Sequence, residues 1–391
     1  MTLRKQNGIR LAKRLDEVGF SDIVQIRNKV MSMRAEGLQI HALHGGEPFF
    51  ETPDDVKFAA VRALVANQTH YAPSSGLLPL RQAMVNKLAA KNGIRVTPDE
   101  VIVTVGGSQG LYAAFQSVLD PGDDALVFSP YWTPIGDLVT STQARPLRVP
   151  TITARRNGIR KTLEQFSTPR VRAIYYNTPQ NPSGLVFTRE EAEEVAAFAR
   201  ERDLIVIADE AYEDLVYEGE HVSIASLPGM LERTITCYTF SKTYAMTGWR
   251  AGYAVAKEPF MTALRKIVLY STNGVATPVQ YAMMQALTIP ESVIAARREE
   301  YRKRRDLLIA GLNEVGLDCD PPCGAFYAFP NTEKIDKNSR KAAQILLEKA
   351  HIATIPGSVF GAQGEGHLRF GYAIPIRDIE NCVEALRRFL G

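Results

Sequence analysis

The feature that most constrains the fold is a regular alternation of short apolar runs with polar, helix-compatible stretches between residues 101 and 256. Six of the runs show little alternation of apolar and polar residues, which is typical of strands buried on both faces of a sheet. They cover residues 101–105, 125–128, 171–176, 204–208, 234–239 and 251–256. Residues 189–202 have the pattern of an amphipathic crossover helix. We therefore predict an α/β fold, a three-layer sandwich whose mostly parallel central sheet has helices on both faces.

The C-terminal part of the chain has a different pattern. We expect a long, charged helix at residues 291–315, a short strand at residues 325–329 and a closing helix from about residue 376. This order predicts a second, smaller α+β unit.

Composition narrows the possible functions. The chain has 391 residues, and 46 Lys and Arg against 43 Asp and Glu leave a net charge of +3, which argues against a polybasic nucleic-acid-binding arm. The basic run at residues 297–305 contains acids and predicts a solvated helix face. Only two of the four cysteines are close in sequence, and no second Cys or His pair lies near them to complete the four ligands of a zinc site. The cysteines therefore predict free thiols rather than a metal site. Because the sequence shows neither a secretory signal nor an apolar run of about 20 residues, we expect a soluble, cytoplasmic protein.

Polar clusters follow the predicted strands, where a ligand of such a sheet is expected. The glycine-rich turn at residues 106–110 opens a helix, and its free N–H groups suit an anion such as phosphate. Its spacing fits neither a dinucleotide fingerprint nor a P-loop, and such a turn can also be a plain strand-to-helix connection. In the loop at residues 177–184, two X-Pro steps fix the amide of Asn181, which favours a binding site.

Two charged residues at strand ends carry the strongest chemical signal. Asp209 follows a very apolar run, and its carboxylate needs either a cationic ligand atom or a capping role at a helix start. Lys242 follows another such run, beside Thr239 and Ser241 and eight residues before Arg250. Burial and a nearby cation lower the pKa of a lysine, which makes its amine a nucleophile that can form Schiff bases. The alternative for Lys242 is an ordinary surface lysine.

Together these clusters resemble the fold-type I pyridoxal-phosphate enzymes, and among them the class I and II aminotransferases of the aspartate aminotransferase superfamily. The motifs that carry the resemblance run through nearly the whole chain in family order. They are Gly45-Gly46-Glu47-Pro48, Tyr71 with Gly76, Pro121-Gly122-Asp123, Ser129-Pro130-Tyr131-Trp132, Asn181-Pro182-Ser183-Gly184, Asp209-Glu210-Ala211-Tyr212, Ser241-Lys242, Gly248-Trp249-Arg250, Gly324-Ala325-Phe326-Tyr327 and Leu368-Arg369-Phe370. The resemblance implies a large cofactor domain at residues 48–288 and a small domain built from residues 1–47 and 289–391.

The resemblance also implies roles for single residues around pyridoxal 5'-phosphate. Lys242 would hold the cofactor through a Schiff base and then move the α-proton of the substrate, while Asp209 would pair with the pyridine nitrogen. Tyr212 and Asn181 would bind the phenolic oxygen of the ring, and Trp132 would stack on its face. The groups expected to hold the cofactor phosphate lie at a helix start and after a strand: Gly107, Ser108, Gln109, Thr239, Ser241 and Arg250.

The remaining roles concern the substrate and a second subunit. Arg369 would receive the substrate α-carboxylate through two parallel hydrogen bonds, and Gly46, Asn181 and Trp132 would complete the substrate site. Tyr71 would reach the cofactor phosphate of a neighbouring subunit, which implies a homodimer with shared active sites. No metal and no nucleic-acid or membrane partner is implied.

The implied reaction is a ping-pong transfer of an amino group from an L-amino acid to a 2-oxo acid such as 2-oxoglutarate or pyruvate. Three residues depart from the common pattern: Phe49 replaces an Asp, Ser183 replaces a Thr, and Ser108 stands where relatives acting on acidic substrates carry Lys. The missing cation at Ser108 and the apolar Phe49 favour a neutral or aromatic donor over aspartate. The same scaffold also hosts β-lyases, decarboxylases and cyclopropane-forming synthases, and it serves as a sensor domain in some transcription regulators.

Overall fold

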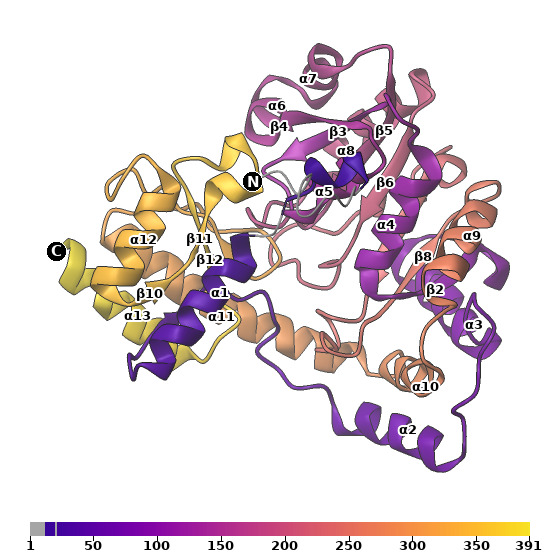
Figure 1. Ribbon diagram of the computed structural model, residues 1–391, viewed down its shortest axis with the longest axis horizontal. Helices are drawn as coiled ribbons and strands as arrows, with labels where there is room; N and C mark the ends of the chain where they lie inside the picture. Colours follow the sequence, from indigo (N-terminus) through magenta and orange to yellow (C-terminus); the bar gives the residue numbers. More distant parts are fainter. Residues whose placement is uncertain (1–11, 20–21) are drawn as a thin grey trace, which may run out of the picture.

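The computed structural model describes residues 12–19 and 22–391, and its main element is a seven-stranded sheet with the order β2-β8-β7-β6-β5-β3-β4 (Figure 1). The strands of this sheet are β2 (Val101–Val105), β3 (Asp124–Ser129), β4 (Arg145–Pro150), β5 (Val171–Asn177), β6 (Ile205–Asp209), β7 (Thr234–Thr239) and β8 (Ala251–Val255). Strands β4, β3, β5, β6 and β7 pair in parallel, and β8 runs antiparallel to both of its neighbours. The predicted α/β fold with a mostly parallel sheet is confirmed.

The six strands expected from the sequence are present, but β4 was missed. Its sequence, Arg-Pro-Leu-Arg-Val-Pro, is not an apolar run, because β4 lies at the edge of the sheet and pairs only with β3. An edge strand leaves one row of backbone groups unpaired, so it tolerates prolines and charged side chains.

Helices cover both faces of the sheet. On β3, Ala125 and Val127 pack with helices on one face, and Leu126 and Phe128 pack with helices on the other. The first set of helices is α4 (Gly106–Val118), α5 (Pro134–Ser141) and α9 (Phe260–Thr272). The second set is α6 (Thr151–Asn157), α7 (Ile159–Phe166) and α8 (Arg189–Glu201). Near β2 and β8, a further cluster involves α2 (Asp54–Val65), α3 (Leu78–Lys87) and α10 (Thr277–Ala286).

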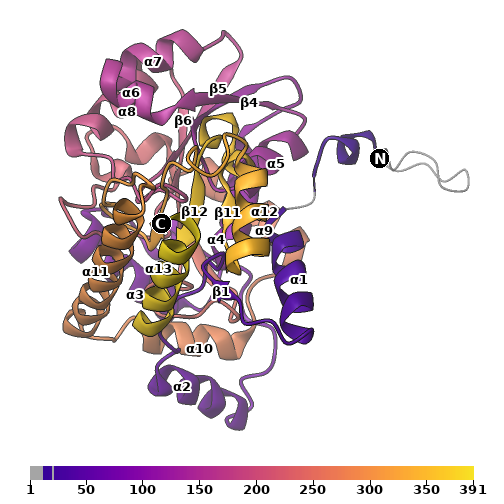
Figure 2. The ribbon, with the colours of Figure 1, turned by 90° about the vertical axis from the view of Figure 1, so that its left-hand side faces the viewer.

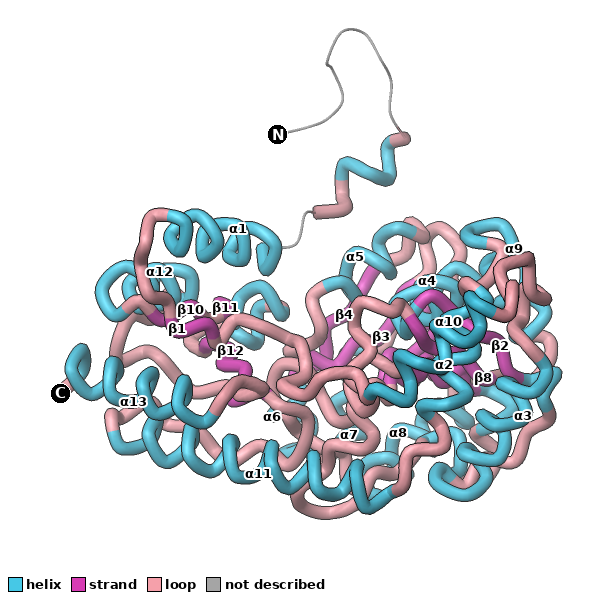
Figure 3. Tube along the Cα trace, turned by 90° about the horizontal axis from the view of Figure 1, so that it is seen from below, coloured by secondary structure: helices cyan, strands magenta, loops and turns pink. Residues whose placement is uncertain are grey.

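The C-terminal part of the chain builds the other end of the molecule, together with an N-terminal segment (Figure 3). Strand β1 (His41–Ala42) pairs in parallel with β10 (Ile352–Ala353). Strands β9 (Tyr327–Ala328), β12 (Leu368–Gly371) and β11 (Ile355–Pro356) form a small antiparallel sheet. The helices of this end are α1 (Asp22–Ala35), α12 (Ser339–Ala350) and α13 (Ile376–Leu390).

Helix α11 (Glu291–Glu314) connects the two ends of the molecule. Ile294, in its first turn, packs in the cluster of α2, α3 and α10, whereas Leu308 and Leu312 pack with α13. Figure 2 shows α11 and α13 side by side. The expected helices at residues 291–315 and from residue 376 are confirmed, and the expected strand at 325–329 is shorter. The domain limits after residues 47 and 288 stay a prediction.

None of the helices in the described residues combines the length and the apolar character that crossing a bilayer requires.

Candidate active site

A cavity of about 450 Å³ opens at the carboxyl ends of β5, β6 and β7, whose last residues Asn177, Asp209 and Thr239 line it. This is where the ligand of such a sheet was expected. The structure also brings residues from other parts of the chain to this place. The predicted site residues that line the cavity are Gly46, Gly107, Ser108, Trp132, Asn181, Asp209, Tyr212, Thr239, Ser241, Lys242, Arg250 and Arg369.

Lys242 extends into the cavity from the segment after β7. Its Nζ donates a hydrogen bond to the carbonyl oxygen of Gly46 at 2.6 Å. Burial lowers the pKa of Lys242 to about 8, and the guanidinium groups of Arg369 and Arg250 add to this effect against the carboxylate of Glu47. An amine with this pKa is partly uncharged near neutral pH, so it can act as a nucleophile or as a base.

Asp209 presents a buried carboxylate with no cation in contact among the described side chains. It is 6 % exposed, and its oxygens accept hydrogen bonds from the Tyr175 hydroxyl at 2.8 Å and from the Ala211 N–H at 3.2 Å. Burial raises the pKa of Asp209 to about 6, although both hydrogen bonds oppose this shift. A protonated ring nitrogen or another cationic ligand atom would stabilise the ionised form.

The first turn of α4 and the segment after β7 form a surface suited to an anion. Gly106 has a φ of +70°, which favours glycine, and a Cβ there would lie 2.5 Å from Nη2 of Arg250, so a larger residue would displace the guanidinium from its present place at the helix start. The Arg250 guanidinium donates to the carbonyl oxygen of Thr247 at 2.9 Å, and the Thr239 hydroxyl donates to the Ser241 hydroxyl at 2.9 Å. Helix N–H groups, hydroxyls and a guanidinium are the groups that bind phosphate in proteins.

Arg369 is the third cation of the cavity, and it is 2 % exposed. Its Nη1 donates to Oδ1 of Asn181 and its Nη2 to the carbonyl oxygen of His44, each at 3.0 Å, while its Nε is buried without a partner. The ring centroid of Tyr327 lies 4.4 Å from the guanidinium. Burial lowers the pKa of Arg369. No described carboxylate pairs with this buried cation, which therefore suits an anionic ligand group such as a carboxylate.

Two predicted site residues do not line the cavity. Tyr71 is 93 % exposed and lies away from it. The side chain of Gln109 is used inside the protein: its oxygen accepts from the Val105 N–H at 2.7 Å, and its amide donates to the hydroxyls of Ser271 and Thr272 at 2.8 Å. Gln109 thus fixes the start of α4 with its side chain.

Several residues that line the cavity were not predicted from the sequence, among them Ile23, Glu47, Leu111 and Tyr327. Glu47 and Tyr327 belong to sequence motifs that this chain shares with the class I and II aminotransferases, and those motifs could have identified them. Ile23 has no such signal, because its position depends on how α1 packs in the folded chain. Phe49 lies outside the cavity, with its ring 4.2 Å from the Arg304 guanidinium.

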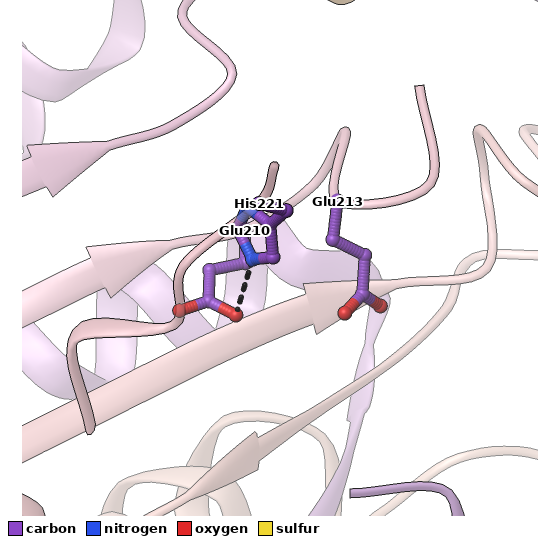
Figure 4. A group of neighbouring side chains, drawn as sticks. All are labelled: Glu210, Glu213 and His221. Carbon is purple, nitrogen blue, oxygen red and sulfur yellow. Dashed lines mark hydrogen bonds and ion pairs between the residues drawn. The ribbon is translucent and has the colours of Figure 1, made fainter. Parts of the chain in front are cut away.

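Behind Asp209, the side chains of Glu210, Glu213 and His221 bring their oxygen and nitrogen atoms within 4.8 Å of one another (Figure 4). Nε2 of His221 lies 3.0 Å from a Glu210 oxygen, and Lys87 donates to Glu213 at 2.5 Å. Burial lowers the pKa of His221, but the carboxylates of Glu210 and Glu213 outweigh burial and raise it. We interpret this group as a buried ion-pair network, because Lys87 and His221 supply the positive charge that its carboxylates require.

Comparisons with known proteins agree with this geometry. The family model described as "Aminotransferase class I and II" matches residues 40–386. A "Probable aspartate/prephenate aminotransferase" of Thermus aquaticus is 40% identical, with 97% of this chain and 98% of that protein covered. An "Aromatic-amino-acid aminotransferase 2" of Thermococcus litoralis is 37% identical, with 97% and 98% covered. The solved structure of Thermus thermophilus aspartate aminotransferase with maleate has a TM-score of 0.93 at 38% identity, and 98% of this chain and 100% of that chain are covered.

These findings define the class first: the protein is an enzyme of fold type I that depends on pyridoxal phosphate. Within that class, the chain belongs to the class I and II aminotransferases, since the family model covers most of its length. It is a transaminase, whose substrates are small molecules, namely amino acids and 2-oxo acids. The predicted family, cofactor and reaction type are confirmed.

Proposed function

We propose that this aminotransferase takes its amino group from a neutral or aromatic L-amino acid in preference to aspartate, and passes it by a ping-pong mechanism to a 2-oxo acid such as 2-oxoglutarate or pyruvate. One observation carries the donor preference. Among the described residues that line the cavity, the cations are Lys242, Arg250 and Arg369, and each is matched by one group of cofactor or α-amino acid. No lining cation is left for a side-chain carboxylate, and Ser108 supplies only a hydroxyl.

The cavity residues fit pyridoxal phosphate at each of its polar groups. The Gly106 cradle beside Arg250, with the hydroxyls of Thr239 and Ser241, suits the phosphate, and the unpaired carboxylate of Asp209 suits the pyridine nitrogen. The other side chains proposed to contact the ring are Trp132, Asn181 and Tyr212. When bound, the cofactor supplies an aldehyde for the amino group and a ring that withdraws electrons from the α-carbon.

The chain itself binds the substrate and moves the proton. We propose that Arg369 binds the α-carboxylate and that Asn181, which already accepts a hydrogen bond from Arg369, fixes the guanidinium in place. Gly46 and Trp132 complete this part of the site. The Lys242 amine takes the proton from the α-carbon as a base and later donates a proton as an acid. This role suits an amine whose pKa is lowered to about 8 by burial.

The decisive experiment is a half-reaction screen, in which the holoenzyme is mixed with each common L-amino acid without an acceptor. The visible absorbance of the holoenzyme reports the reaction. Phenylalanine, tyrosine or neutral aliphatic amino acids should convert the cofactor to its amine form faster than aspartate, with release of one equivalent of 2-oxo acid. A hundredfold preference for aspartate would contradict the donor preference. Release of ammonia with pyruvate would indicate a β-lyase instead, release of carbon dioxide a decarboxylase, and binding without turnover a sensor.

We also propose a cytoplasmic homodimer with shared active sites. The support for the dimer is a group of exposed apolar side chains on α2 in the single chain. They are Phe58, Val61, Leu64 and Val65, with exposed fractions from 51 to 78 %. Patches of this kind mark protein interfaces. Sedimentation equilibrium should give twice the chain mass, and a Val65→Lys substitution should shift the equilibrium toward the single chain.

A further inference from the structure

A buried hydrogen bond joins the segment that carries Lys242 to the segment that carries Asp209. The hydroxyl of Thr243, the residue after Lys242, donates to Oδ2 of Asp214 at 2.6 Å. Thr243 is 7 % exposed and Asp214 is 3 % exposed. Asp214 lies two residues after Tyr212, in the turn that follows Asp209 at the end of β6. The bond therefore links two segments that meet at the cavity but are far apart in sequence.

Asp214 is held from other directions as well. Its second carboxylate oxygen forms an ion pair with Nζ of Lys91, which also donates to Glu291 at 2.9 Å. Arg298 donates to the carbonyl oxygen of Asp214 at 3.2 Å. Burial raises the pKa of Asp214, but the ammonium groups of Lys91 and Lys87 outweigh burial and hold it below its usual range. The carboxylate is thus a charged acceptor at neutral pH, and hydrogen bonds to charged acceptors are the strong ones.

The position of the Lys242 amine matters because charges of both signs face it. Arg369 and Arg250 face the amine as cations, and Glu47 and Asp209 face it as anions. A small displacement of Nζ changes the balance of these interactions and the alignment of the amine with the reacting atoms. Neither Thr243 nor Asp214 lines the cavity, so their contact acts on Lys242 only through the backbone.

We propose that the hydrogen bond from Thr243 to Asp214, supported by Lys91, is a positioning contact that sets where the Lys242 amine stands relative to Asp209 and Tyr212. Thr243 and Asp214 are positioning residues, since neither touches substrate or cofactor. This inference rests on the proposed roles of Lys242 and Asp209.

The test removes the hydroxyl with Thr243→Val, which keeps the shape of the side chain. We expect the half-reaction rate to fall by about 10- to 100-fold with little change in the KM of the amino acid, as for a misaligned reacting group. The second measurement uses the cofactor-free protein: acetic anhydride acylates the Lys242 amine, and mass spectrometry measures the extent of acylation at each pH. We expect the pH midpoint of this acylation to differ between Thr243→Val and the wild type. Thr243→Ser retains the hydroxyl and should restore both values.

The matched control is Thr162→Val on α7, which removes another buried hydroxyl, bonded to the Gly158 carbonyl oxygen at 2.9 Å and outside the cavity. We expect the control to lower only the melting temperature. If Thr243→Val also lowers only the melting temperature, the contact is merely structural and the inference is wrong. If Thr243→Val does not fold, Asp214→Asn should show the same shifts in weaker form, and unchanged rate and midpoint would overturn the inference. If the wild-type holoenzyme itself fails to transaminate, the proposed function fails, and the acylation midpoint still tests the contact.

Discussion

The cations of the cavity differ in their surroundings, and this difference decides what each can do. Arg369 is buried with one donor unused and no carboxylate beside it, so it suits an anionic ligand group. Arg250 is exposed and faces a helix start, which suits a phosphate. Lys242 has its pKa lowered to about 8 by burial and can exchange a proton near neutral pH. These are properties of single residues, and single substitutions test them.

Arg369→Ala should lower kcat/KM for the amino acid about 10- to 150-fold, because a hydrogen bond to a charged group contributes about 1.5–3 kcal/mol. Arg369→Lys should recover part of this loss, since it keeps the charge without the planar pair of donors. Steady-state kinetics give the ratios, and fluorescence titration should show unchanged cofactor affinity. Arg302→Ala, at an exposed arginine paired with Glu299, serves as the control. Loss of the cofactor with an unchanged KM would show that Arg369 does not bind the substrate.

Asp209→Asn should stabilise the cofactor-free protein at pH 8 while abolishing most of the transaminase activity. The pKa of Asp209 is about 6 in the fold, mainly because of burial, against an ordinary 3.8, so folding favours the protonated carboxyl group over the ionised one. Its contribution to stability is therefore full below pH 4 and is lost as the pH rises through 6. Removing the charge should raise the free energy of unfolding by about 3 kcal/mol at pH 8.

Urea unfolding of the cofactor-free wild type and of Asp209→Asn, at pH 4 and at pH 8, measures this difference. The two proteins should unfold at similar urea concentrations at pH 4 and should differ at pH 8. A variant that is less stable than the wild type at pH 8 would mean that the buried carboxylate has a favourable partner in the cofactor-free protein.

At the scale of elements, the sequence pattern predicted the strands that are buried on both faces, because such strands must be apolar throughout. It missed β4 (Arg145–Pro150), whose edge position removes that requirement. The same limit applies to the site. Lys242 and Asp209 were predictable, since charged residues directly after apolar strands are unusual. The contributions of Ile23 and of the bond from Thr243 to Asp214 were not, because they depend on how distant elements pack.

The edge strand β4 depends on a charge pair at its start. The Asp124 carboxylate is buried and accepts from Arg145 at 2.8 and 3.0 Å and from the Thr168 hydroxyl. Arg145→Met should lower the urea midpoint of the holoenzyme at pH 7 without changing kcat. Arg189→Met, which removes an exposed pair with Glu220, should have a smaller effect.

The effect of Arg145→Met should also depend on pH. Burial raises the pKa of Asp124, but the hydrogen bonds from Arg145 and Thr168 outweigh burial and lower it. The stability that this pair contributes is therefore present above the unfolded pKa near 4 and is lost as the pH falls through the lower folded pKa. The difference between wild type and variant should shrink in acid. A difference that grows in acid would show that the ion pair does not stabilise β4.

At the scale of the whole molecule, the single chain leaves Tyr71 93 % exposed and outside the lining of its own cavity. If the site is shared, Tyr71 serves the active site of the second subunit, and two defective chains can complement each other. Lys242→Ala and Tyr71→Ala homodimers should each have strongly reduced activity. Mixed and exchanged in equal amounts, they should form hybrids in which one site carries both changes and the other carries neither.

Random exchange would make about half of the dimers hybrids with one intact site each, so the mixture should recover about one quarter of the wild-type activity. The control is a mixture of Lys242→Ala with Asp209→Asn. Both residues line the same cavity of one chain, so no exchange can create an intact site and no activity should return. Native mass spectrometry of isotope-labelled chains confirms that hybrids form. Hybrids without recovered activity in the Tyr71 mixture would show that each subunit builds its active site from its own residues alone.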